Sequence, residues 1–262
     1  MKYRRCRAAL RVSSDVSLLE RIQAVKSEHP FWGYRRVWAY LRFIAGLPVN
    51  KKRVYRLLKE NNLLVRAETR LLAKRLSNTR KPRPERANQW WGIDMTKVMT
   101  YSGWAYVVLV LDWYSKKIVG HYCGEQSKSW HWLAALNKAV NRQFPGGIRE
   151  MEIELNLMSD NGSQPTSRAF METCAGLEIK QAFTAYNNRE GNADTERMMR
   201  TLKEELCWLR EWQSVDELKT ALDNFVEDFN SGYLHSALGY KTPNAFEKEH
   251  FKNQQATLNL AA

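Results

Sequence analysis

The feature that most constrains the fold is an almost unbroken apolar run at residues 104–112, WAYVVLVLD. Its Val and Leu residues favour an extended conformation, and it is far too short for a helix that spans a bilayer. A strand that is apolar on both faces must lie near the centre of a covered sheet. Two further strands are predicted at residues 90–95 and 116–123, and the short connections between the three indicate an antiparallel meander.

The region that follows alternates between helical and extended patterns. Helices are predicted at residues 129–142 and 167–175, strands at residues 151–158 and 178–183, and another helix from residue 191. The order βββαβαβα predicts an α/β fold in which a mixed five-stranded sheet is flanked by helices.

The helix predicted at GNADTERMMRTLKEE has two distinct faces. Apolar residues at steps of three and four indicate a buried stripe, which consists of Met199, Leu202, Leu206 and Leu209. Glu196, Arg200 and Lys203 lie on a different face, and Lys203 follows Glu196 by almost two full turns. A carboxylate beside two cations can help to hold a metal ion while the cations hold phosphate.

Two more carboxylates are candidates to join Glu196. Asp94 lies on the first predicted strand, and Asp160 follows the fourth strand, just before the turn-forming pair Asn161-Gly162. If these strands are parallel neighbours, both carboxylates reach one edge of the sheet. Mg²⁺ prefers carboxylate ligands, and two ions about 3.5–4 Å apart could clamp the attacking and leaving oxygens of a phosphoryl transfer. The spacing of the acids alone is weak evidence, so the hypothesis depends on their positions in the fold.

Positive charge is concentrated in the first third of the chain. Residues 1–88 hold 23 Lys and Arg against 6 Asp and Glu, a net charge of +17. Residues 89–262 hold 18 against 22, a net charge of −4. The asymmetry favours a polyanion-binding module joined to a second domain, although a solvated basic surface would give the same count.

The first 66 residues have the pattern of a helix-turn-helix module. Helices are predicted at residues 16–26, 34–44 and 51–61, and Gly46-Leu47-Pro48 forms a turn between the last two. Asn50 is a suitable N-cap for the third helix. A small helical bundle with a basic surface is the alternative interpretation.

The cations of this module are its candidate DNA contacts. The third helix carries Lys51, Lys52, Arg53 and Arg56, which would lie near a groove of DNA. Arg35 and Arg36 precede the turn and are assigned to backbone phosphate.

The remaining segments complete the predicted domain organisation. Residues 67–88 form a basic linker that contains two prolines, and residues 89–210 form the α/β core. Residues 211–262 form a helical tail that packs on the core and begins with a capping box at Ser214 and Glu217. The four Cys residues are scattered, and no apolar run is long enough for a membrane span. We therefore expect reduced thiols in a cytoplasmic chain, without a disulfide framework or zinc site.

Several segments resemble the DDE transposases of bacterial insertion sequences, whose catalytic protein has a retroviral-integrase-like core. They occur in family order from about Phe31 to Glu247, and they are FWGYRRVWAYLR, VNKKRVYRLLKENNLL, NQWWGIDMTKV, VLVLDWYSKKIVG, LMSDNGSQPTS, GNADTERMMRTLKEE and HSALGYKTPNAFE. Together they are far more specific than any single motif.

The resemblance implies a ribonuclease-H-like core in which Asp94, Asp160 and Glu196 bind Mg²⁺ or Mn²⁺. It implies cleavage at element ends by water, followed by attack of the freed 3′-hydroxyl on another phosphodiester, without a covalent protein–DNA intermediate. Lys203 matches a family cation that is expected to contact element-end DNA. Tyr233 departs from the family, since many relatives carry Arg at this position, and that departure weakens any DNA-binding role there.

The expected partner is double-stranded DNA of the element ends and the target, in the bacterial cytoplasm and nucleoid. Pairing of two ends implies a homo-oligomer. The chain lacks the zinc-binding domain of retroviral integrases and a leading coiled coil, so the active species could be a fusion with an upstream-frame protein. Two other functions are compatible with the residues: a catalytically inactive DNA-binding regulator, and a metal-dependent nuclease that acts on RNA–DNA hybrids.

Overall fold

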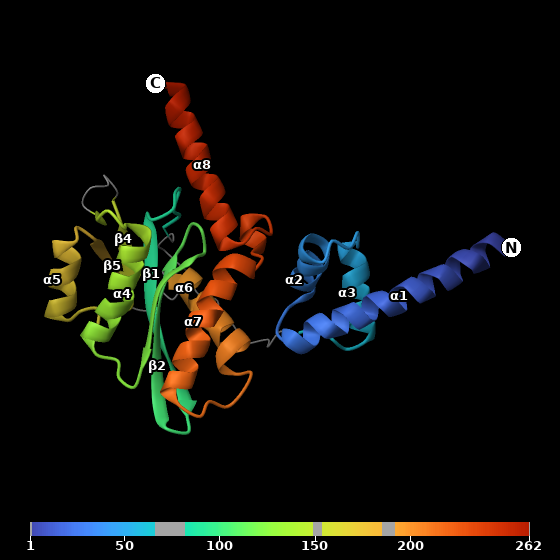
Figure 1. The fold of residues 1–262 in the computed structure, drawn as a ribbon, viewed down its shortest axis with the longest axis horizontal. Coiled ribbons are helices and arrows are strands. Elements are labelled where there is room, and N and C mark those ends of the chain that lie inside the picture. The colour runs from blue at the N-terminus through green and yellow to red at the C-terminus, as the bar shows by residue number, and fades with distance from the viewer. Residues whose placement is uncertain (1, 66–81, 149–153, 185–191, 262) are drawn as a thin grey trace, which may run out of the picture. The chain divides into compact units, whose positions relative to one another are not determined.

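The computed structural model describes residues 2–65, 82–148, 154–184 and 192–261, with side chains described between residues 15 and 254 of these ranges. The chain forms two compact units (Figure 1). The N-terminal unit contains Met1–Lys74 and Leu234–Tyr240. The core unit contains Arg75–Tyr233 and Lys241–Ala262. The linker predicted at residues 67–88 lies mostly outside the described residues.

A five-stranded sheet forms the centre of the core unit, in the order β3-β2-β1-β4-β5. The strands are β1 (Trp90–Thr100), β2 (Gly103–Asp112), β3 (Ile118–Gly124), β4 (Asn156–Ser159) and β5 (Lys180–Phe183). β1, β2 and β3 are antiparallel, whereas β4 is parallel to β1 and β5 is parallel to β4. The predicted mixed sheet is confirmed, and so is the parallel pairing on which the carboxylate hypothesis depends.

Helices cover both faces of this sheet (Figure 1). The helices of the core unit are α4 (Ser129–Gln143), α5 (Arg168–Gly176), α6 (Ala193–Leu202), α7 (Val215–Gly232) and α8 (Pro243–Ala261). α4 and α5 share one apolar core with the sheet, α6 and α7 contact the strands from the other face, and α8 packs on α7.

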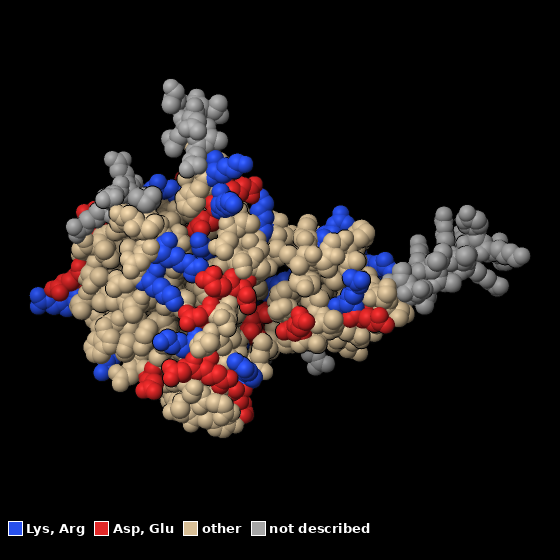
Figure 2. All heavy atoms as spheres, in the orientation of Figure 1, with Lys and Arg blue, Asp and Glu red and all other residues tan. Residues whose placement is uncertain are grey.

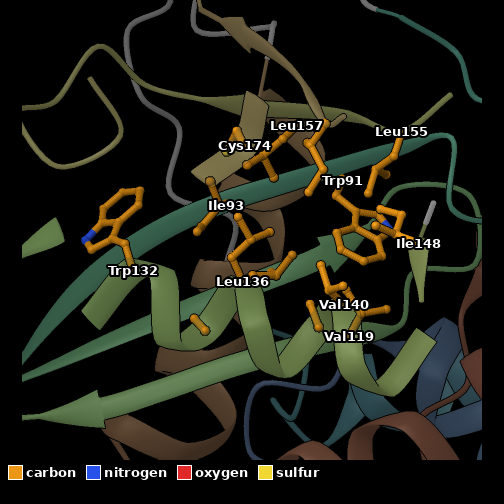
Figure 3. Packing of buried hydrophobic residues seen from close by; sticks show 14 of the residues in the cluster. Trp91, Ile93, Val119, Trp132, Leu136, Val140, Ile148, Leu155, Leu157 and Cys174 are labelled. Carbon is orange, nitrogen blue, oxygen red and sulfur yellow. The ribbon is translucent and has the colours of Figure 1, made fainter. Parts of the chain in front are cut away.

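Alternation along β1 separates the apolar core from the opposite face. Trp91 and Ile93 point into the cluster formed with Trp132 and Leu136 of α4 (Figure 3). These side chains are almost completely buried, as expected for a strand covered on both faces. Because successive side chains point to opposite faces, the residues next to Trp91 and Ile93 face α6.

The predicted elements of the core unit differ from the structure in several details. The fourth strand begins at Asn156, since Glu154 and Leu155 are not in a strand and residues 151–153 lie outside the described part of the chain. The stripe predicted on the α6 helix fails at its end, where Leu206 is half-buried and Leu209 is exposed. α6 continues into a π-helical turn, η4 (Lys203–Cys207), whose wider spacing turns Cys207 inward instead.

α7 begins as its sequence predicts. Ser214 Oγ accepts the N–H of Glu217 at 3.2 Å, and the Glu217 carboxylate accepts the N–H of Gln213 at 2.8 Å. The buried Asn230 side chain exchanges two hydrogen bonds of 2.9 Å with the backbone of Ile118, which fixes α7 to β3. Tyr233 is buried and stacks on Phe229, so it does not present its ring to solvent.

In its described residues, the N-terminal unit has three α-helices around one small core. They are α1 (Lys2–Glu28), α2 (Tyr34–Ala39), which continues into the π-helical turn η1 (Tyr40–Ile44), and α3 (Lys51–Glu60). The Asn50 side chain accepts the N–H of Lys52 at 2.9 Å, which confirms the predicted N-cap. The turn before α3 contains Gly46 at φ +65°, a conformation that favours glycine. An α-helical period would bury Ile44 together with Val37 and Leu41, but Ile44 is exposed because the π-helical turn rotates it outward.

The segment Leu234–Tyr240 belongs to the N-terminal unit, although it lies near the other end of the chain. Tyr240 packs edge-on against Trp38, with ring centroids 5.2 Å apart, and its ring centroid lies 6.0 Å from that of Phe43.

None of the described helices is long and apolar enough to cross a membrane. Acidic and basic side chains are interspersed on the face of the core unit shown in Figure 2, with Asp and Glu gathered over α7.

Candidate functional site

Strand register brings two of the predicted carboxylates to the same level of the sheet. Gly92 of β1 is paired with Met158 of β4. Asp94 follows Gly92 by two residues, and Asp160 follows Met158 by two residues. Because parallel strands advance by the same distance per residue, Asp94 and Asp160 reach the same edge of the sheet.

The third carboxylate comes to this edge because Gly92 has no side chain. A Cβ built on Gly92 would lie 1.9 Å from Oγ1 of Thr195 and 2.5 Å from Nε1 of Trp113. The first turn of α6 therefore lies directly on the backbone of β1. Glu196 follows Thr195 immediately, so the close contact that excludes a Cβ at Gly92 also fixes where Glu196 begins.

Two polar contacts hold this first turn of α6 against the loop after β2. The indole Nε1 of Trp113 donates a hydrogen bond to Oγ1 of the buried Thr195 at 3.0 Å. Lys116 forms an ion pair with Asp194 at 3.0 Å. Lys116 has φ +59°, so the turn that carries its side chain is itself tightly constrained. The Glu196 helix is thus attached to two different segments of the sheet.

The pKa of Asp94 depends on its burial and on the charges of the other residues at this edge of the sheet. The pKa of Asp94 is raised from 3.8 to about 6, chiefly by burial; the charges of Asp160 and Glu196 also raise it, whereas the N–H of Met95 and the charge of Lys203 lower it. These groups therefore interact electrostatically across three separate elements.

The carboxylates are nevertheless not assembled into a finished ligand set. Among the described residues, no three His, Cys, Asp or Glu side chains are arranged so that they could hold one metal ion. Asp94 is partly buried, while Asp160 and Glu196 are exposed. Like charges repel at short range in the absence of a cation, which opposes tighter convergence of these side chains.

Local hydrogen bonds fix the loop that carries Asp160. Its Oδ1 accepts the N–H of Gly162 at 3.0 Å, and Asn161 Nδ2 donates to the carbonyl of Thr184 at 2.7 Å. A Cβ on Gly162 would lie only 3.0 Å from Oδ1 of Asp160. The Asn-Gly pair thus forms the predicted turn and also ties it to the end of β5.

The two cations of the α6 region differ in their surroundings. Arg200 is exposed, and its Nε forms an ion pair with Glu204 at 2.7 Å. Lys203 is half-buried at the junction of α6 and η4, and its charge acts on Asp94. Lys203 is therefore the cation of this pair that belongs electrostatically to the carboxylate edge.

The cations predicted on α3 are largely engaged within the N-terminal unit. Arg53 and Arg56 each contact the Asp15 carboxylate at 2.6 Å, and the two guanidinium groups lower the pKa of Asp15. Arg56 also pairs with Glu60 at 3.1 Å. Lys51 Nζ lies 4.3 Å from the centroid of the Trp38 ring.

Three other basic residues of this unit, Lys52, Arg35 and Arg36, are also predicted DNA contacts. Lys52 is exposed and makes no ion pair within the described residues. Arg35 Nε donates to the hydroxyl of Tyr34 at 3.2 Å, and the guanidinium of Arg36 lies 5.7 Å from the Trp32 ring. Both arginines are thus placed by a neighbouring aromatic ring.

Several residues that shape the site do not stand out in the sequence as site residues. They are Gly92, Trp113, Thr195 and, in the N-terminal unit, Asp15. The sequence carries a signal for two of them: a glycine inside a strand pattern marks a close backbone approach, and Asp15 is the first acidic residue in a strongly basic stretch. Trp113 and Thr195 lie 82 residues apart, and no local pattern links them.

Comparison with known families matches the two parts of the chain separately. Residues 84–188 and residues 177–243 each match an integrase core domain family, and residues 13–70 match an HTH-like domain. The transposase InsD of insertion element IS2A/D/F/H/I/K from Escherichia coli is 28% identical over 259 residues, which cover 91% of this chain and 81% of the relative. The InsD transposase of element IS2D from strain K12 is similar to the same extent.

A solved structure with a TM-score above 0.5 shares the fold at low sequence identity. The simian T-cell lymphotropic virus intasome, in complex with PP2A regulatory subunit B56 gamma, aligns with a TM-score of 0.52 and 15% identity over 80% of this chain and 73% of that chain. The HTLV-2 integrase catalytic core in complex with magnesium gives a TM-score of 0.48 and 19% identity over 63% of this chain and 99% of that chain.

The first prediction concerns Asp94 in protein without metal. Its folded pKa of about 6 exceeds the ordinary 3.8, so the folded state binds this proton more tightly than the unfolded chain does. Stability should therefore fall as pH rises through this interval, and Asp94→Asn should remove the fall. We expect the variant to be more stable at neutral pH by on the order of 2 kcal/mol, with no gain near pH 4.

Thermal unfolding in EDTA across this pH range measures the effect, with the exposed Asp228→Asn on α7 as the matched control. An Asp94→Asn protein that is less stable than the wild type at neutral pH would contradict the assigned pKa.

The second prediction concerns the contact of α6 with the backbone of β1 at Gly92. Gly92→Ala introduces a Cβ that overlaps Thr195 and Trp113, so α6 must move away from β1. We expect a loss of at least about 2 kcal/mol in the free energy of unfolding. Gly176→Ala is the control, because a Cβ there meets nothing within 4 Å. Equal stability of the two variants in urea denaturation would show that α6 does not lie on Gly92.

Proposed function

Because this chain belongs to the DDE-type transposases of insertion sequences, we propose that it cuts DNA at the ends of its element and joins the freed 3′-hydroxyls to target DNA. Integrase core and HTH-like domains in one chain, in this order, support a protein that both binds DNA and acts on its phosphodiester bonds. Asp94, Asp160 and Glu196 are the proposed catalytic carboxylates.

One observation carries the assignment of these residues. The strand register that pairs Gly92 with Met158, and the close contact of Thr195 with Gly92, bring acidic residues of β1, of the end of β4 and of α6 to one edge of the sheet. An acidic cluster without a cation is unfavourable beside DNA, which is itself a polyanion. A DNA-binding protein without catalytic activity has no use for such an edge, which favours the transposase over a regulator.

The donor set fits a hard divalent cation. Only carboxylate oxygens are offered, and these are the ligands of Mg²⁺ and Mn²⁺ rather than of zinc. We propose that Asp94, Asp160 and Glu196 hold two such ions in the active complex. When bound, the ions would supply charge stabilisation for the attacking and leaving oxygens of the phosphodiester.

The chain's own residues position the DNA. Lys203 would hold a phosphate next to the carboxylates, since it is the cation whose charge reaches Asp94. Arg200 would leave its ion pair with Glu204 and contact a phosphate of the DNA backbone elsewhere along α6. Burial raises the pKa of the Cys123, Cys174 and Cys207 thiols to about 12, so they are unsuited to a covalent intermediate.

The N-terminal unit is the proposed end-recognition domain. Lys52 would contact phosphate directly, and Arg35 and Arg36 would do so from the preceding helix. Arg53 and Arg56 face DNA in an orientation set by Asp15, and Lys51 is braced by Trp38. The basic segment at residues 67–88 would join this unit to the core at residues 89–210, with 211–262 as the helical tail. We further propose a homo-oligomer on paired ends, either alone or as a fusion with an upstream-frame protein.

Asp160→Asn tests the proposed chemistry. The substitution keeps the hydrogen-bonding shape of Asp160 but removes its charge, so cleavage and strand transfer with Mg²⁺ should fall by a factor on the order of 10³ or more. Binding of the same DNA in EDTA should be unchanged. The exposed Asp228→Asn should retain full activity. Strand transfer by pure Asp160→Asn protein would refute the assignment, and cleavage confined to RNA–DNA hybrids by the wild type would favour the nuclease.

Lys52→Ala tests the DNA-binding surface. We expect weaker binding to duplex DNA of every sequence, with the dependence of log K on log salt reduced by about one. Lys51→Ala should also destabilise the N-terminal unit by about 1 kcal/mol, because it loses the contact with Trp38. Fluorescence anisotropy at several salt concentrations measures binding, with Lys252→Ala on α8 as control. An unchanged salt slope for Lys52→Ala would exclude this lysine from the interface.

A further inference from the structure

A hollow of about 460 Å³ opens in the core unit between residues 97–101 and the segment from Lys203 to Trp212. Its walls are the far end of the β1–β2 hairpin and the connection from η4 to α7. Lys203 is part of its lining, and the charge of the same lysine acts on Asp94. The hollow and the carboxylates therefore share one side chain as their border.

Large apolar side chains are exposed around this hollow. Tyr101 is 69% exposed, Trp208 is 61% exposed and Met99 is 57% exposed. Scattered apolar residues are normal on a protein surface, but a group of this size around one concavity marks a binding site. Two of the three are aromatic and can stack on a planar ligand.

The floor beneath these rings is fixed by hydrogen bonds. The N–H of Tyr101 donates to the carbonyl of Trp212 at 2.9 Å, and Trp212 Nε1 donates to the carbonyl of Cys207 at 3.2 Å. Trp212 itself is buried, and the guanidinium of Arg210 stacks 4.2 Å from its ring centroid. The exposed rings are therefore carried by a rigid base, which favours ligand binding over collapse of the hollow.

The charges around the hollow favour an anion. Lys97, Lys203 and Arg210 contribute three cations to its lining, and Glu211 contributes one carboxylate, which accepts a hydrogen bond from the Tyr101 hydroxyl. Arg210 also pairs with Glu217 at 3.4 Å. Exposed aromatic rings interleaved with cations form the surface that binds single-stranded nucleic acid, because the rings stack on bases and the cations hold the backbone.

We propose that this hollow binds one unpaired nucleotide of DNA beside the cleavage site, with its base stacked on Trp208 and its phosphate on Lys203. A duplex cannot enter a concavity of this volume, whereas a single base can. The proposal rests on the proposed function only in taking DNA as the substrate. It would give the enzyme a way to hold a frayed end open on the Lys203 side of the carboxylates.

A DNA-binding assay in EDTA tests this proposal separately from DNA cleavage and strand transfer. The full chain in EDTA is titrated against a fluorescent blunt duplex and against the same duplex with a short single-stranded extension. We expect wild-type protein to prefer the extended duplex, and Trp208→Ala to lose that preference by about tenfold. Trp208→Phe should keep most of the preference, since it retains a stacking ring.

Trp130→Ala is the matched control, because Trp130 on α4 is 57% exposed and also has a lysine beside it. The Nζ of Lys128 lies 4.9 Å from the centroid of the Trp130 ring. It should bind both duplexes like the wild type. Equal affinity of the wild type for both duplexes, or an unchanged preference in Trp208→Ala, would overturn the proposal. So would a Trp208→Ala protein whose only change is its oligomeric state in sedimentation, since the hollow would then bind protein. None of these outcomes depends on whether the wild type performs strand transfer.

Discussion

The absence of a side chain at Gly92 is the constraint on which the site depends. A single methyl group there would overlap Thr195 and Trp113, so α6 lies on β1 only because the contact is made by bare backbone. Glu196 is the residue after Thr195, and Asp94 is two residues after Gly92. One close contact therefore fixes the relative positions of two carboxylates that are far apart in sequence. A glycine inside a strand usually weakens that strand, and here the weakening is offset by the hydrogen bond and ion pair that hold α6.

The third carboxylate depends on the parallel register of β4. Side chains on a strand alternate between two faces, so a shift of one residue would carry Asp160 away from Asp94. The described β4 is only four residues long, Asn156–Ser159, and its paired neighbours on both sides resist such a shift. The loop after it is closed by Asp160 itself and by Asn161. The site is therefore held by backbone pairing and short turns, while the side chains of Asp160 and Glu196 are exposed.

Sequence patterns predict those parts of this structure that depend on neighbouring residues. The order of strands and helices, the N-cap at Asn50 and the capping box at Ser214 all follow from local patterns. The π-helical turns are not predictable in this way, and for that reason Ile44 and Leu209 are exposed where an α-helical period would bury them. The pairing of Asp15 with Arg53 and Arg56 spans some forty residues and depends on how α1 packs against α3. Such contacts are set by tertiary packing, which a single sequence does not reveal.

The distribution of cations separates the tasks of the two units. In the N-terminal unit, Arg53 and Arg56 are oriented by Asp15, so part of the large positive charge is used to hold the α3 surface in one arrangement. Such bracing lowers the number of free charges, but under the proposed function it would reduce the entropy lost when an oriented guanidinium meets DNA. In the core unit, Lys203 lies between a group of carboxylates and an aromatic hollow. A cation in that position lowers the repulsion at the acidic edge, and under the proposed function the same charge would attract the phosphate of the substrate.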